Sequence, residues 1–217
     1  MHLIAECEDD SLIVAPEVSL SGFDYENLEA VLAFSILAIE ALLKATKNKT
    51  LIITMLERSG TKIYNNVKVF HRGRVIHSRA KARLFRLGDE HKYMHEGDEG
   101  AIEILNIDGV RVGILICFEL RFKELWQRVE GADVIATPSW WGVARSEHFR
   151  ALTQSLAIIN QCYVVASDSA NSECSALGGI ITPQGQEQRN GNKPCLKVEY
   201  QQKEIALMRR YINVGIE

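Results

Sequence analysis

The sequence predicts an α/β protein with a mixed sheet or two packed sheets. Short apolar runs that end at turn residues alternate with longer segments whose apolar side chains recur at helical spacing, and this alternation is typical of the α/β class. Neighbouring strand-like runs joined by short turns add antiparallel hairpins to the expected sheets. The chain has 217 residues, which is enough for one sizeable core. We therefore expect residues 1–217 to form a single domain.

The first half of the chain predicts a short strand, a long helix and a series of longer strands. Leu12–Ala15 is an apolar run that ends at Pro16, as a buried strand would. Asp24 is expected to cap a helix that continues to about Lys47, because apolar side chains form one stripe along it. Strands are then predicted over Leu51–Leu56, Lys62–Phe70 and Arg74–Ser78, followed by a long polar loop over residues 82–100.

The second half opens with a predicted hairpin. Asp108-Gly109 suits a type I′ turn between strands over Ala101–Ile107 and Val110–Cys117. Leu12–Pro16 is similar to Val134–Pro138, which suits two similar α/β halves. The remaining predictions are helices over about Phe122–Val129 and Glu147–Asn160, and strands over Asp133–Pro138, Tyr163–Ser167, Ala176–Thr182 and Cys195–Glu199.

Composition excludes several classes of partner. A net charge of −3 lacks the excess of positive charge that binding to nucleic acid or an acidic membrane requires. No apolar stretch reaches membrane-spanning length. The start of the chain has no signal peptide pattern, and five widely spaced cysteines without Cys-x-x-Cys favour reduced thiols in the cytoplasm. His91 and His95 lack the further ligands that a metal site needs. We therefore expect no metal and no other cofactor.

Cys117 is the first candidate catalytic residue. It closes the apolar run that begins at Gly113, and the carboxyl end of a strand is where open α/β sheets bind ligands. A thiol there is a nucleophile if a base and a positive charge hold it as the thiolate. Position alone favours the other interpretation, a buried cysteine that packs as a small hydrophobe.

Glu17 and Lys81 are the candidate partners of that thiol. Glu17 closes the first strand beside apolar residues, where a carboxylate suits a general base. Lys81 lies where a strand gives way to the long polar loop, and a buried ammonium there would stabilise a thiolate and an oxyanion. Taken singly, each residue fits an ordinary solvated charge better.

Together, Glu17, Lys81 and Cys117, in this order and each at a strand end, resemble the nitrilase superfamily of carbon–nitrogen hydrolases. Further segments resemble the superfamily's motifs in the expected order. These segments are Ala15–Phe23, Lys81–Phe85, Glu90–Gly97, Gly113–Glu124, Ala132–Trp140 and Asn160–Val165.

The resemblance implies a role for each matched residue. Cys117 would be the nucleophile, Glu17 the general base, and Glu90 a second glutamate that orients the substrate and the base. Lys81 and the backbone N–H of Phe118 would hold the tetrahedral oxyanion. The Pro-Ser-Trp-Trp-Gly block resembles the ω-amidase-like branch and adds Ser139, Trp140 and Trp141 as substrate-binding candidates, although the two tryptophans also fit core or interface positions.

The resemblance also implies a four-layer α-β-β-α sandwich that forms a homodimer or a higher homo-oligomer. Four departures from the family pattern stand out. Glu119 replaces the usual Asp, and Lys123 replaces the usual Pro. Leu156 and Ile159 stand where the family commonly has Arg and Glu, and Met1–Glu8 looks like only the last turns of the long first helix. We therefore expect a domain that lacks the first strand and most of the first helix.

The function implied is hydrolysis of a small linear amide, with release of ammonia and a carboxylate through a thioester on Cys117. The expected partner is thus a small-molecule amide, with no nucleic acid or membrane. Two alternatives stay open: an N-carbamoyl-amine hydrolase, and a catalytically silent truncated member that acts as a binding protein. The sequence does not distinguish an ω-amide from a simple aliphatic amide or an N-carbamoyl compound.

Overall fold

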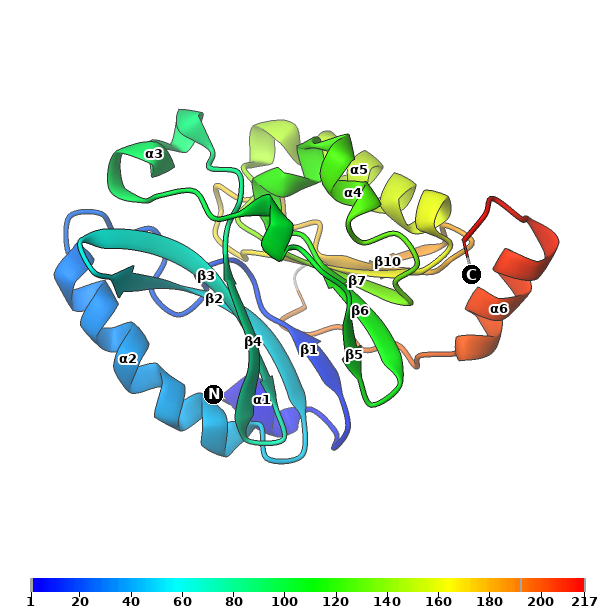
Figure 1. Ribbon diagram of the computed structural model, residues 1–217, viewed down its shortest axis with the longest axis horizontal. Coiled ribbons are helices and arrows are strands. Elements are labelled where there is room, and N and C mark those ends of the chain that lie inside the picture. The colour runs from blue at the N-terminus through cyan, green and yellow to red at the C-terminus, as the bar shows by residue number, and fades with distance from the viewer. Residues whose placement is uncertain (1, 192, 217) are drawn as a thin grey trace. The chain divides into compact units, whose positions relative to one another are not determined.

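The computed structural model describes residues 2–191 and 193–216, and it divides into two units, Met1–Ala101 and Ile102–Glu217. Each unit has a mixed sheet with helices packed against it (Figure 1). The α/β class with two sheets, predicted from the alternation of strands and helices, is therefore confirmed. The single-domain organisation over residues 1–217 stays a prediction.

The first unit contains a sheet with strand order β1-β2-β3-β4. The short strand β1 runs parallel to β2, with Leu12 opposite Thr50, and the remaining neighbours are antiparallel. The strands are β1 (Leu12–Val14), β2 (Thr50–Ser59), β3 (Lys62–His71) and β4 (Arg74–Ala80). The helical segments are α1 (His2–Glu6), α2 (Leu28–Ala45), α3 (Glu90–Tyr93), and the 3-10 turns η1 (Arg86–Gly88) and η2 (Glu99–Ala101).

Helix α2 packs against β2 and supplies one side of this unit's core. Of the apolar stripe predicted for the helix, Val31, Leu32 and Leu42 are buried, whereas Ile36 is exposed. The buried cluster comprises Leu42, Leu51, Ile53, Met55 and Phe70.

Asp24 does not begin α2, so that prediction is wrong. Its carboxylate accepts a hydrogen bond from the backbone N–H of Asn27 at 3.1 Å, and the helix begins only at Leu28. A local turn of this kind satisfies an aspartate as well as a helix N-cap does. The long loop predicted over 82–100 contains the three short helical turns rather than extended chain.

The second unit contains a sheet with strand order β10-β9-β8-β7-β6-β5. Its centre, β6, β7 and β8, is parallel, and the outer pairs are antiparallel. The strands are β5 (Leu105–Ile107), β6 (Val110–Ile114), β7 (Val134–Ser139), β8 (Tyr163–Asp168), β9 (Gly179–Ile181) and β10 (Glu187–Arg189). The helical segments are η3 (Cys117–Arg121), α4 (Lys123–Gln127), η4 (Val143–Arg145), α5 (Ser146–Asn160) and α6 (Gln202–Tyr211), with α5 against β8 and β9.

The strand predicted over Cys195–Glu199 is wrong. Those residues form no strand, and β9 pairs instead with Glu187–Arg189, a polar segment that carries no apolar signal. The Pro183-Gln184-Gly185 turn determines this pairing because Gly185, with φ of 80°, returns the chain directly alongside β9. Within the described ranges, no helix has the length and apolar character needed to cross a membrane.

Candidate active site

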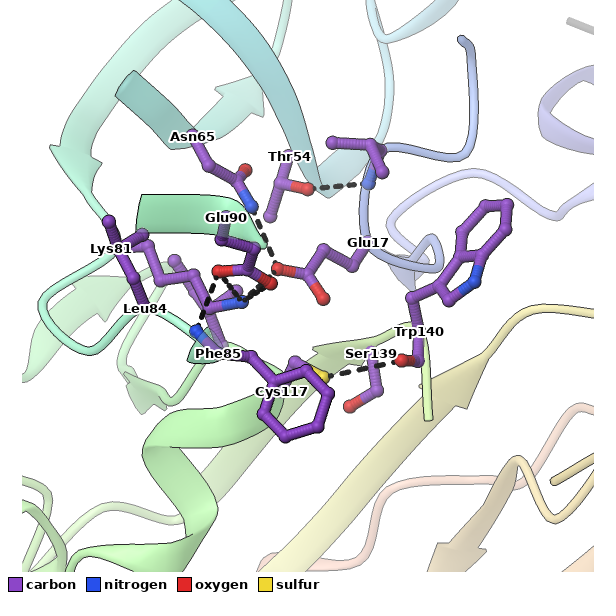
Figure 2. Close-up of polar contacts among 12 residues, drawn as sticks. Glu17, Thr54, Asn65, Lys81, Leu84, Phe85, Glu90, Cys117, Ser139 and Trp140 are labelled. Atoms are coloured by element: carbon purple, nitrogen blue, oxygen red, sulfur yellow. Dashed lines mark hydrogen bonds and ion pairs between the residues drawn. The ribbon is translucent and has the colours of Figure 1, made fainter. Parts of the chain in front are cut away.

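The side chain of Lys81 is fully buried between two glutamates of the first unit. Its Nζ lies 2.7 Å from Oε1 of Glu17 and 2.8 and 3.0 Å from the two carboxylate oxygens of Glu90. Figure 2 shows the amine pointing toward both carboxylates. The structure therefore brings together three of the residues predicted from the sequence, from three separate segments of the chain.

Glu17 is fixed by contacts on both sides. Its Oε1 also accepts a hydrogen bond from Nδ2 of Asn65 at 2.7 Å. The next residue, Val18, is buried with φ of 42°, and its backbone N–H donates to Oγ1 of Thr54 at 2.7 Å. A β-branched residue in the left-handed region is strained, and such strain persists only where the surroundings enforce it.

Glu90 is presented by the short helix α3. The backbone N–H of Phe85 donates to Oε2 of Glu90 at 3.0 Å, which holds the carboxylate against Lys81. The Lys81 backbone is held as well, because its N–H donates to the carbonyl of Asn65 and its carbonyl accepts from Gly97, each at 2.8 Å. The polar loop thus closes back on the lysine that precedes it.

Tyr25 lies beside this cluster and stacks on Tyr93, with ring centroids 4.1 Å apart and planes 5° from parallel. Burial, followed by the charge of Glu90, raises the pKa of the Tyr25 hydroxyl well above its ordinary value. Tyr25 therefore stays protonated at neutral pH. The stack joins the segment after Glu17 to the helix that carries Glu90.

Cys117 lies in the second unit, where it opens η3 rather than ending β6, which stops at Ile114. The residue is buried and has φ of 43°, a left-handed conformation that is strained for any residue with a Cβ. Its thiol donates to the carbonyl oxygen of Trp140 at 3.6 Å (Figure 2). The chain turns sharply between the end of β6 and the start of η3, and Cys117 lies in this turn.

Glu119, which replaces the family's usual Asp, supports this turn. Its side chain is fully buried, and Oε2 accepts a hydrogen bond from the backbone N–H of Ile116 at 2.7 Å. The backbone N–H of Glu119 in turn donates to the carbonyl of Ile116 at 2.9 Å. Glu119 thus binds both backbone polar groups of Ile116, and these two hydrogen bonds hold the turn that carries Cys117.

The remaining predicted site residues surround the end of β7 and the start of η3. Ser139 is buried, and its hydroxyl donates to the carbonyl of Thr137 at 3.2 Å. The indole N–H of Trp141 donates to the carbonyl of Arg145 at 2.8 Å, and its ring lies 4.8 Å below the guanidinium carbon of Arg121. Trp140 is half-buried, as is Phe118, whose ring packs edge-on against Phe122.

The Carbon-nitrogen hydrolase family model matches residues 3–192. The chain belongs to the carbon–nitrogen hydrolase family. This carbon–nitrogen hydrolase is 30% identical to the 2-oxoglutaramate amidase of Bacillus subtilis (strain 168), in a match that covers 96% of this chain and 85% of that protein. It is 31% identical to the omega-amidase YafV of Escherichia coli (strain K12), covering 81% and 70%.

Solved structures of the nitrilase superfamily share the fold. A CN-hydrolase superfamily protein of Xanthomonas campestris matches with a TM-score of 0.80 at 20% identity, covering 97% of this chain and 84% of that one. Nit3 of Saccharomyces cerevisiae matches with a TM-score of 0.79 at 22% identity, covering 95% and 82%. The superfamily and its ω-amidase-like branch, expected from the sequence motifs, are confirmed.

Two polar residues of this carbon–nitrogen hydrolase site, Asn65 and Thr54, were missed by sequence reasoning. Asn65 lies in β3 in phase with the buried residues Val67 and Val69, so a polar side chain on the buried face was a usable signal. Thr54 gives no such signal, because β2 is buried on both faces around it. Over residues 2–191 and 193–216, no three His, Cys, Asp or Glu side chains gather where they could hold a metal ion.

Proposed function

We propose that this chain is an amidase that hydrolyses a small linear amide through a thioester on Cys117. The observation that carries the proposal is the buried contact between Lys81 and Glu17, with Glu90 on the other side of the same amine. A buried carboxylate that takes a proton, beside a buried cation that holds negative charge, supplies what attack of a thiol on an amide requires.

In the first half of the reaction, Glu17 takes the thiol proton and the sulfur of Cys117 attacks the amide carbon. Lys81 and the backbone N–H of Phe118 hold the resulting oxyanion, and each such donor stabilises it by about 3–4 kcal/mol. The C–N bond then breaks. The amine takes the proton from Glu17 and leaves as ammonia, so the acyl group remains on the sulfur as a thioester.

In the second half, Glu17 takes a proton from water, and the hydroxide attacks the thioester carbon. The C–S bond breaks, Glu17 returns its proton to the sulfur, and the product acid leaves and releases a proton to solvent as it becomes the carboxylate. Glu90 holds Lys81 and the substrate in place throughout. The two amidase relatives support an ω-amide of a dicarboxylic acid as the substrate class.

The experiment compares wild type with Cys117→Ser on glutaramate, a simple aliphatic amide and an N-carbamoyl amine, and measures ammonia release with the intact mass of the protein. Cys195→Ser, at an exposed cysteine, is the matched control. Ammonia release from glutaramate by wild type and the control alone, with an acyl adduct on Cys117, supports the proposal.

Two other outcomes contradict it. Turnover of the N-carbamoyl compound alone indicates an N-carbamoyl-amine hydrolase. No turnover by a folded wild type indicates a silent family member.

We also propose that the protein forms a homodimer, which light scattering tests. We propose a cytoplasmic location as well, because a nucleophilic thiol has to stay reduced.

A further inference from the structure

The carboxylate of Asp168 links two segments of the second unit. It lies at the end of β8 and is buried. Oδ1 accepts a hydrogen bond from the backbone N–H of Trp141 at 2.8 Å. Oδ2 accepts from the backbone N–H of Ser175 at 3.1 Å and from its hydroxyl at 2.5 Å. Nothing in the reaction described above uses this side chain.

The two segments that Asp168 joins also pair with each other. Gly142 and Cys174 form an antiparallel bridge, and the backbone N–H of Ser175 donates to the carbonyl of Trp141 at 2.7 Å. Asp168 binds a backbone N–H of each paired segment, that of Trp141, which follows β7, and that of Ser175. The N–H of Trp141 therefore donates to a carboxyl group, which accepts a stronger hydrogen bond when ionised than a neutral group does, and burial raises the pKa of this carboxyl.

The N–H of Trp141 and the carbonyl of Trp140 belong to one peptide group. That group is planar, and in a trans peptide its N–H and C=O point in opposite directions. Asp168 holds the N–H end, and the C=O end accepts the thiol of Cys117 at 3.6 Å. A rotation of the peptide at one end must therefore move the hydrogen bond at the other.

We propose that Asp168 is a positioning residue for Cys117, because it orients the Trp140–Trp141 peptide that holds the thiol. The inference deepens the proposed function, on which its kinetic test rests. A hydrogen bond donated by the thiol favours its protonated form and holds the sulfur in one place. Loss of that bond lets the sulfur move, and a displacement of about 1 Å costs on the order of a hundredfold in rate.

The test compares wild type with Asp168→Asn, Asp168→Glu and Ser175→Ala. Asparagine keeps the shape but has an NH2 group in place of one oxygen, so it cannot accept at both the Oδ1 position, which faces Trp141, and the Oδ2 position, which faces Ser175. Glutamate keeps the charge but displaces both oxygens. Alanine at position 175 removes the hydroxyl bond to Oδ2 and the bond that this hydroxyl accepts from the backbone N–H of Leu177 at 3.2 Å, but it leaves the bond from Trp141 to Oδ1, so it is the matched control. Near-UV circular dichroism selects the variants that fold. Asp168→Ser, which has a shorter acceptor side chain, replaces an Asp168 variant that does not fold.

The first readout is alkylation of Cys117 by iodoacetamide as a function of pH, followed by the mass of its peptide. The guanidinium of Arg121 interacts electrostatically with this thiol and is unchanged in every variant. In wild type, burial, followed by the charge of Asp168, raises the pKa of Cys174 to about 11. The mass of the Cys117 peptide keeps the two thiols apart in the variants that lack this charge. We expect the pH midpoint to fall by about 0.5 units or more in both Asp168→Asn and Asp168→Glu, and to stay at the wild-type value in Ser175→Ala.

The second readout is steady-state kinetics on the amide that wild type turns over. We expect kcat to fall at least about tenfold in the two Asp168 variants, with KM within about twofold of wild type. Wild-type labelling in both Asp168 variants overturns the inference. A shift in Asp168→Asn alone also overturns it, because charge would then be the cause, as does an equal shift in Ser175→Ala. Labelling does not depend on turnover, so an inactive wild type would contradict the proposed function without deciding this inference.

Discussion

Nζ of Lys81 and Oε1 of Glu17 lie 2.7 Å apart with both side chains buried, although the two residues are 64 positions apart in the sequence. Removal of one member of a buried ion pair leaves the other charge buried without compensation. Asn65 binds the same carboxylate oxygen, and Glu90 binds the same amine. A change at any one of these side chains therefore affects the others. Its effect on the free energy of unfolding and its effect on amide hydrolysis can be measured separately.

Lys81→Ala should lower the free energy of unfolding by about 3–5 kcal/mol, because two buried carboxylates lose their cation. Urea unfolding followed by circular dichroism measures this change. The control is Lys92→Ala, which removes the exposed ion pair with Asp89 from α3. That pair should contribute no more than about 1 kcal/mol. Equal losses in both variants would mean that the buried cluster contributes no more than a surface pair.

Glu17→Gln should keep the fold and lose activity. The amide oxygen of glutamine can still accept hydrogen bonds from Asn65 and Lys81, whereas it cannot take a proton from the thiol or from water. Loss of a general base lowers kcat by about a hundredfold to ten-thousandfold. Ammonia release measures the loss, and Glu57→Gln, a half-buried glutamate of β2, is the control. An active Glu17→Gln variant would remove Glu17 from the mechanism.

Gly97→Ala should disturb the segment that holds Lys81. A Cβ at this position would lie 2.6 Å from the carbonyl oxygen of Ala80, so the backbone next to Lys81 has to shift. Overpacking of this kind costs about 1–3 kcal/mol. We expect a lower melting temperature together with reduced ammonia release.

Gly100→Ala is the matched control for Gly97→Ala. Its Cβ would meet only the flexible carboxylate of Asp98, at 3.1 Å. We expect stability and activity close to wild type there. A Gly97→Ala variant that behaved like Gly100→Ala would show that the loop does not constrain Lys81.

Glu119→Ala should destabilise the turn at Cys117. It leaves the buried N–H of Ile116 without the carboxylate acceptor, at a cost of about 1–3 kcal/mol. Glu119→Gln has a side chain of the same length with an acceptor oxygen, so it should lower the free energy of unfolding much less. Thermal unfolding and the rate of Cys117 alkylation measure both effects. Equal behaviour of the two variants would show that the hydrogen bond to Ile116 does not matter.

Asp133 should contribute a pH-dependent part of the stability of the second unit. Burial raises its pKa, but hydrogen bonds from Arg111 and the charges of Arg111 and Arg209 outweigh burial and hold the pKa below its ordinary value. A depressed pKa means that the stabilisation is present above the unfolded value of about 3.9 and is lost as the pH falls through the folded value.

Asp133→Asn should therefore lower the free energy of unfolding by about 1–3 kcal/mol at pH 7, and this difference from wild type should shrink as the pH falls below about 4. Urea unfolding at a series of pH values measures it. The exposed Glu130→Gln variant should follow wild type at every pH. A difference between Asp133→Asn and wild type that stayed constant down to pH 2 would contradict the ionic origin of the effect.

Two elements differ from their sequence-based predictions because the signal that decides them is not local. Asp24 has the composition of a helix cap, but its carboxylate binds Asn27 and the helix starts later. Cys195–Glu199 alternates like a strand, whereas the polar segment Glu187–Arg189 forms the strand because the preceding turn returns it to β9. Pairing partners decide such cases, and pairing is not readable from one segment alone.

The sequence by itself determined the α/β class, the order of most elements and the family, and it supplied the candidate catalytic residues, because each depends on periodicity or on a short motif. Only the tertiary structure decided how Lys81 is held between Glu17 and Glu90, that Asn65 shares the carboxylate, and that Asp168 holds the peptide to which Cys117 donates. These contacts join residues far apart in the chain. Their geometry depends on strand register and loop closure, which no local pattern of residues specifies.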